Sequence, residues 1–205
     1  MKDPVKLLRK DYFHRHPVKE HSAAKLMYST LLMPEIVSKM DSLMAELRKQ
    51  AARSGVALPS DAHERAQVAQ EEDTGRLLRM FRRPLPLEVS GVLIEKPLER
   101  EAGALAEIQR AILKTFSEGT IENCVRFMAR CEANCSAWIL QNHSDVREPY
   151  ARSMLCLVLG FRADAEAIPF LMQQVERFES QFPEQSLEQA PLLALCEMRA
   201  RFRTV

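Results

Sequence analysis

Two apolar helical patterns in residues 145–178, DVREPYARSMLCLVLGFRADAEAIPFLMQQVERF, constrain the fold most strongly. Met154 and Leu157 belong to the first pattern, and Leu171 and Val175 belong to the second. In each pattern apolar residues recur every three or four positions, which places them on one face of a helix. A glycine stands near the end of the first pattern and a proline near the start of the second. We therefore expect two helices joined by a short turn and packed closely against each other.

The rest of the sequence also favours helices over strands. Its 205 residues include only six glycines, and 46% of them are apolar, a composition typical of helical globular proteins. Thr120 is a candidate N-cap, and the pairs Asp145 with Glu148 and Ser186 with Gln189 are candidate capping boxes. We expect helices over residues 22–32, 34–54, 60–81, 98–118, 120–142, 145–160 and 165–178, and a last helix from residue 186.

A change of character between these helices predicts a division of the chain. The stretch LEVSGVLIEK, residues 87–96, follows two prolines and is interpreted as a linker or a short strand. Residues 1–86 then form an N-terminal helical segment with a basic tail, and residues 97–205 form a second helical domain. The sequence leaves open whether the N-terminal segment packs on that domain.

Residues 145–178 resemble one HEAT-type repeat. In that family the first helix has an arginine near its start, small or apolar residues on its inner face and a glycine at its end. A turn with an aspartate follows, and the second helix opens with an apolar residue and a proline. The residues that match these places are Arg147, Ala151, Leu155, Gly160, Asp164, Ala167, Ile168, Pro169 and Leu171. The helices expected at 98–118 and 120–142 resemble a more divergent preceding unit, so the resemblance extends over residues 97–202.

The resemblance implies an all-α fold, an α-solenoid-like stack of antiparallel helix pairs with additional N-terminal helices. Neither helix of such a pair buries its apolar face alone, so successive pairs cover one another. The stack is expected to be right-handed and curved, with a groove lined by the second helices that contacts another protein. The expected function is a protein–protein interaction scaffold or adaptor. The alternative is a nucleic-acid-binding helical-repeat protein, with chemistry similar to that of DNA-repair glycosylases.

Three cysteines, Cys124, Cys131 and Cys135, fall on the helix expected at 120–142, in line with Met128 and Trp138. Three thiolates together with a histidine could bind zinc, but structural zinc sites generally use closely spaced cysteine pairs on turns. A cysteine also packs in a core as a small apolar residue. We interpret the three as reduced core residues and keep a metal site as the alternative.

The densest group of histidines is His14, His16 and His21, in HRHPVKEH. The H-x-H pair could bind a metal from an extended segment, with Asp11 or Glu20 completing the site. The spacing lacks the H-E-x-x-H pattern of helical zinc sites. We therefore favour a solvated basic segment that docks on a groove, and predict no metal and no cofactor.

Four arginines, Arg76, Arg79, Arg82 and Arg83, lie close together in GRLLRMFRRP. Spacings of three and four residues would place several of them on one helix face, where they could contact the phosphates of a nucleic acid. Cations near the end of a helix also stabilise the helix itself. The net charge of only +1 argues against an extended phosphate-binding surface, so the second interpretation is favoured.

The sequence contains no recognisable catalytic pattern. A nucleophile elbow, a P-loop and a dinucleotide fingerprint are all missing, so we assign no catalytic residue. Because no apolar run is long enough to cross a membrane, we expect no membrane association. Because the five cysteines are interpreted as reduced thiols, we expect a cytoplasmic protein.

Overall fold

The computed structural model describes residues 4–32, 34–56, 61–82 and 87–203. These residues form α-helices joined by turns and short 3-10 helices, with no β-strand among them. The expected all-α fold class is therefore confirmed. No helix within the described ranges is long and apolar enough to span a membrane.

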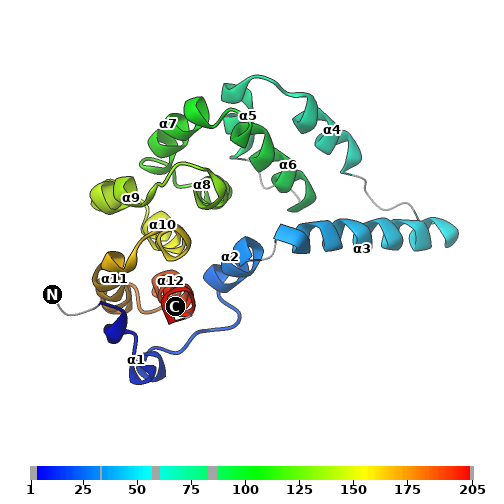
Figure 1. Ribbon diagram of the computed structural model, residues 1–205. Coiled ribbons are helices and arrows are strands. Elements are labelled where there is room, and N and C mark those ends of the chain that lie inside the picture. The colour runs from blue at the N-terminus through cyan, green and yellow to red at the C-terminus, as the bar shows by residue number, and fades with distance from the viewer. Residues whose placement is uncertain (1–3, 33, 57–60, 83–86, 204–205) are drawn as a thin grey trace.

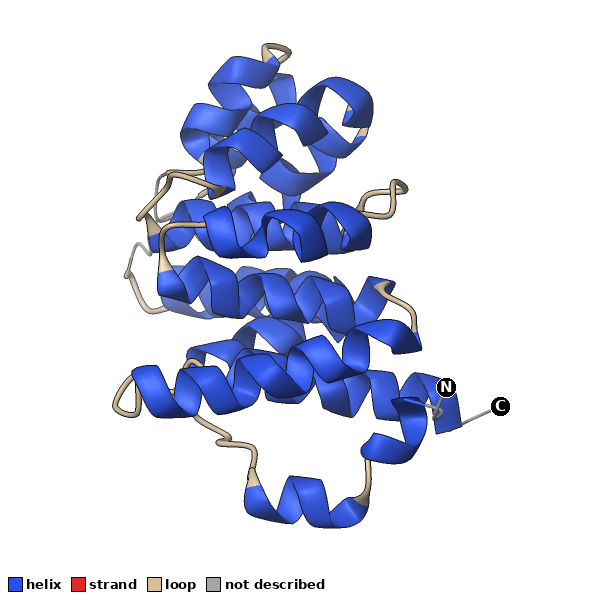
Figure 2. Ribbon diagram, turned by 90° about the vertical axis from the view of Figure 1, so that its left-hand side faces the viewer, coloured by secondary structure: helices blue, strands red, loops and turns tan. Residues whose placement is uncertain are grey.

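The first six α-helices occupy the N-terminal half of the chain (Figure 1). They are α1 (Lys10–Arg15), α2 (Ala23–Leu32), α3 (Pro34–Arg53), α4 (Ala62–Gln70), α5 (Thr74–Met80) and α6 (Leu87–Leu98). The next six are α7 (Glu101–Ile112), α8 (Glu118–Arg130), α9 (Ser136–Asn142), α10 (Pro149–Arg162), α11 (Ile168–Gln181) and α12 (Gln189–Arg203). Three 3-10 helices complete the described elements, namely η1 (Pro4–Leu7), η2 (His143–Asp145) and η3 (Ala165–Ala167). Seen from the side, the helices lie in layers (Figure 2).

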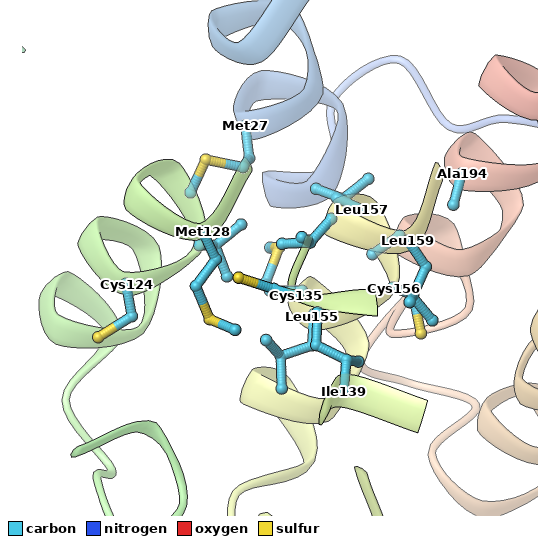
Figure 3. Packing of buried hydrophobic residues seen from close by; sticks show 14 of the residues in the cluster. Met27, Cys124, Met128, Cys135, Ile139, Leu155, Cys156, Leu157, Leu159 and Ala194 are labelled. Carbon is cyan, nitrogen blue, oxygen red and sulfur yellow. The ribbon is translucent and has the colours of Figure 1, made fainter. Parts of the chain in front are cut away.

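Helix α10 lies at the centre of the core. All eight residues from Ser153 to Gly160 are buried, because α10 contacts α8, α9, α11 and α12. Side chains from α2, α8, α9, α10 and α12 approach one another there (Figure 3). The two helices expected from residues 145–178 are present as α10 and α11, but each packs more extensively on α12 than on the other. Helix α12 packs against both α10 and α11, and its residues Leu192–Leu195 are all buried.

Gly160 has a different role from the one expected. It lies inside α10, which continues to Arg162, so it does not end the helix. A Cβ atom added at Gly160 would lie 2.6 Å from the Cα and 2.9 Å from the Cβ of Ala194 in α12. The missing side chain is therefore what allows the backbones of α10 and α12 to approach closely.

The linker or short strand expected at residues 87–96 is wrong, because these residues belong to helix α6. Val89 and Leu93 are four residues apart, and both are fully buried, so the apolar spacing is helical despite its β-branched residues and glycine. Helix α6 packs on α3 and α4 and also on α7 and α8. The region expected to separate two domains is thus a helix that contacts elements before and after it in the chain.

Several helix ends also differ from expectation. The helix expected at 60–81 is two helices, α4 and α5, and the helix expected at 120–142 is also two, α8 and α9. Ser117, not Thr120, caps α8, since its side chain accepts a hydrogen bond from the Thr120 amide. Glu148 caps α10 in the same way, and Asp145 belongs to η2. The residue that caps a helix depends on where the first turn begins, and a sequence pattern places that point only to within a residue or two.

The N-terminal elements return to the C-terminal helices (Figure 1). Element η1 contacts α11, and α2 contacts α12 and α8. The guanidinium of Arg199 in α12 lies 5.0 Å from the ring centre of Phe13 in α1. The segment between α1 and α2 lies against α11 and the start of α12, where the polar contacts described next occur.

Candidate peptide-binding site

The clearest polar site holds the segment between α1 and α2. Its residues 17–19 lack regular secondary structure. The amide of Lys19 donates a hydrogen bond to Oε1 of Gln189 at 2.7 Å, and Nε2 of Gln189 donates to the carbonyl of Pro17 at 3.3 Å. Gln189 is only 1% exposed. One buried side-chain amide therefore bonds a backbone donor and a backbone acceptor of the same segment.

A buried carboxylate beside this amide binds the lysine side chain. Nζ of Lys19 lies 2.8 Å from Oε1 of Glu188 and also donates to Oγ of Ser186 at 3.0 Å. Burial raises the pKa of Glu188, but hydrogen bonds from Lys19 and Gln189 outweigh it and leave that pKa below its usual value. Glu188 is therefore ionised at neutral pH. The bond between it and Lys19 is a charge-assisted hydrogen bond with one buried partner.

The turn between α11 and α12 positions these acceptors. Ser186 has φ 53°, a left-handed conformation that reverses the chain just before Glu188. The amide of Leu192 donates to the carbonyl of Glu188 at 3.1 Å, which places the Glu188 carboxylate at the N-terminus of α12. A helix N-terminus stabilises a carboxylate through its free amides and its dipole. The expected Ser186–Gln189 capping box is wrong, since the Gln189 side chain bonds Pro17, Lys19 and Glu188 instead.

Further contacts flank the segment on both sides. Nδ1 of His16 lies 2.7 Å from Oε1 of Glu179 in α11, and the Tyr28 hydroxyl donates to Glu197 in α12 at 2.8 Å. A cavity of about 260 Å³ borders the site, lined by Pro17, Lys19, Glu179, Pro183, Glu188 and Gln189. Oε2 of Glu188 is buried there without a hydrogen-bond partner among the described residues. The site thus retains one unused acceptor.

The histidines considered for metal binding do not form a metal site in the described structure. His16 contacts Glu179, whereas His14 and His21 are exposed. Among the residues that the structure describes, no group of three or more potential ligands is placed to hold a metal ion. The basic segment instead lies against the C-terminal helices, a placement that the sequence left open.

The three candidate cysteines are buried, as expected for core residues. However, Cys131 and Cys135 do not share a helix face, because Cys131 follows the end of α8 and Cys135 precedes the start of α9. Their sulfurs are 3.4 Å apart. Burial raises the pKa of Cys124, in the middle of α8, to about 12.

The arginine cluster is divided between acidic neighbours and solvent. Arg76 lies 3.7 Å from Glu71, and Arg79 and Arg82 are exposed, while Arg83 lies outside the described residues. Three consecutive acidic residues, 71–73, precede this helix. They lower the local positive potential that phosphate binding needs. Nucleic-acid binding by these arginines stays a prediction.

Sequence reasoning did not single out Lys19 or Glu188, and it considered Gln189 only as the partner of Ser186 in a capping box. A lysine in a basic segment and a glutamate before a helix are common, and nothing local pairs residues so far apart in the chain. Comparison with protein-family models, curated proteins and solved structures found no match to this chain.

Proposed function

We propose that the protein is an interaction scaffold with HEAT-like helix pairs that binds an extended segment of a partner protein at the α11–α12 site. The double hydrogen bond of Gln189 to the backbone at Pro17 and Lys19 carries this proposal. A side-chain amide used in this way recognises extended backbone whatever side chains it bears. Glu188 then adds selectivity for a cationic side chain.

In the free protein the N-terminal segment occupies this site. It therefore competes with a partner's segment at the effective concentration set by the connecting chain. In the free protein Glu188 binds the side chain of Lys19. A partner segment that displaces the N-terminal segment therefore carries a cationic side chain opposite Glu188. Displacement would also free α1 and α2, so partner binding changes the surface that the scaffold presents.

A labelled peptide with the sequence of residues 12–25, YFHRHPVKEHSAAK, tests the proposal by fluorescence anisotropy. The chain with His16→Ala and Lys19→Ala lacks the side-chain anchors of its own segment but keeps the acceptors. We expect it to bind the peptide at least about tenfold more tightly than the wild-type chain, since competition within the molecule lowers apparent affinity. The exposed pair Lys10→Ala and His14→Ala removes similar groups and is the matched control.

Two further measurements locate the binding. Adding Gln189→Ala to the chain with His16→Ala and Lys19→Ala should abolish its gain in peptide affinity. Circular dichroism should show that this triple variant remains folded. A peptide carrying Lys19→Glu should bind the doubly substituted chain at least about tenfold more weakly, because its new carboxylate lies opposite that of Glu188. Equal affinity of the peptide for the wild-type chain and for the chain with His16→Ala and Lys19→Ala would contradict the proposed site.

A further inference from the structure

Cys131 and Cys135 form the one cysteine pair in the described structure whose sulfurs are joined by a hydrogen bond, at 3.4 Å. They stand at the two ends of the turn C-E-A-N-C, between α8 and α9. Both are nearly inaccessible, but the intervening residues 132–134 are exposed. The pair therefore lies directly beneath a surface turn, unlike Cys124 and Cys156, which lie in the middle of α8 and α10.

Side chains from two further helices hold this turn. The carboxylate of Glu101, at the start of α7, accepts hydrogen bonds from the amides of residues 132 and 133 at 2.7 and 2.8 Å. The guanidinium of Arg162, near the end of α10, donates to the carbonyls of residues 131 and 132 at 2.9 and 3.0 Å. The dithiol thus sits where α7, α8, α9 and α10 meet, and side chains of Glu101 and Arg162 hold the backbone of its turn.

The two thiols are not equivalent. The hydrogen bond from Cys135 lowers the pKa of Cys131 against the effect of burial, and the charge of Arg162 lowers it further, whereas Glu101 raises it. The same hydrogen bond and burial raise the pKa of Cys135. Cys131 is therefore the more readily ionised of the two thiols and the expected nucleophile, with Cys135 as its hydrogen-bond partner. A cysteine with a lowered pKa next to a second cysteine that can resolve it is one feature of thiols that react reversibly with oxidants.

We propose that Cys131 and Cys135 are a reversible oxidation site that forms an intramolecular disulfide with hydrogen peroxide as the oxidant. The Cys131 thiolate attacks one peroxide oxygen, the O–O bond breaks, and hydroxide leaves to give a sulfenic acid on Cys131. Cys135 then attacks that sulfur, the S–O bond breaks, and the departing hydroxide takes the Cys135 proton. The first hydroxide takes up the proton that Cys131 released on ionising, so in sum two thiols and one peroxide give one disulfide and two waters. The sulfurs need only close from 3.4 Å to about 2.05 Å.

Mass spectrometry of the full-length protein tests this site directly. Tryptic cleavage after Arg130 and Arg147 places both thiols, and no other cysteine, in the peptide 131–147. After brief exposure of the native protein to peroxide, followed by unfolding and alkylation, we expect this peptide to be two hydrogens lighter and unalkylated. A reductant should restore the alkylated form. Oxidation should be at least about tenfold faster than that of Cys124, whose raised pKa leaves it protonated.

Two variants separate the roles of the thiols. Cys135→Ala should leave a sulfenic acid on Cys131 that a dimedone probe traps, whereas the matched core variant Cys124→Ala should form the disulfide as the wild type does. The wild-type measurement decides the question even if one variant does not fold. Oxidation of the pair no faster than that of Cys124, or conversion to sulfinic acid without a disulfide, would overturn the proposal.

Discussion

Helices α10 and α3 show how differently two apolar patterns of one chain are used. In α10 the residues from Ser153 to Gly160 are buried on every side. In α3 the apolar side chains Leu43 and Leu47 are 61% and 42% exposed, and the helix extends away from the other elements (Figure 1). The periodic spacing alone predicted a helix in both cases. The number of neighbouring helices decides which apolar side chains become core.

The same contrast holds for the two halves of the molecule. The C-terminal helices surround α10 with α8, α9, α11 and α12, whereas α3 contacts only parts of α2 and α6 appreciably among the described elements. Burial of apolar area is the main favourable contribution to folding. Stability should therefore reside in the C-terminal helices, and substitutions of equal chemistry should have unequal effects in the two regions.

The largest expected difference separates two leucines. Leu155 in α10 is fully buried, and its truncation by Leu155→Ala should cost about 2–5 kcal/mol of the free energy of unfolding. Leu43→Ala in α3 removes the same atoms from an exposed position and should change stability by no more than about 0.5 kcal/mol. Chemical denaturation of both variants measures the difference. Similar midpoints would show that α10 is not the centre of the stable core.

A second difference concerns the effect of pH on a buried histidine. His143 donates from Nε2 to the carbonyl of Arg152 at 2.9 Å, and burial lowers its pKa to about 4, against the smaller effect of that hydrogen bond. The unfolded chain gains a proton near pH 6.5, but the folded chain does so only near pH 4. Stability is therefore full above pH 6.5 and declines as the pH falls toward 4, by at most about 3 kcal/mol at 1.36 kcal/mol per pKa unit.

Denaturation between pH 7 and pH 4 checks this expectation. The variant His143→Gln should lose that part of the pH dependence, whereas His14→Gln, at an exposed position in α1, should keep it. If both variants followed the wild-type profile, protonation of His143 would not be linked to unfolding.

A third difference, in the sign of the effect, distinguishes two glycines. Gly160→Ala places a Cβ against Ala194 at the α10–α12 crossing and should cost about 1–3 kcal/mol through overpacking. Gly103 lies in α7 with nothing within 4 Å of an added Cβ, so Gly103→Ala should raise stability by about 0.5–1 kcal/mol. Thermal melting midpoints should therefore shift in opposite directions. A neutral Gly160→Ala would mean that the two helices separate at little cost.

Much of the fold follows from local sequence signals. Helix α3 begins at Pro34 and is followed by Gly55 at φ +74°, because a proline fits the first turn and a glycine the left-handed stop. Helix α6 was missed because its short apolar run with valine, glycine and isoleucine satisfies a strand pattern as well as a helical one. The break at residues 131–135 was missed because the apolar spacing of α8 continues in register into α9.

The sequence by itself determined that this chain is helical and which faces of most helices are apolar, since both depend on residues within a few positions of one another. Only the tertiary structure decided that Gly160 meets Ala194 and that the sulfurs of Cys131 and Cys135 meet across a turn. The same is true of the hydrogen bond that joins Gln189 to the backbone of Lys19, 170 positions away in the chain. Such contacts depend on how whole helices pack, and no local preference of either residue specifies its distant partner.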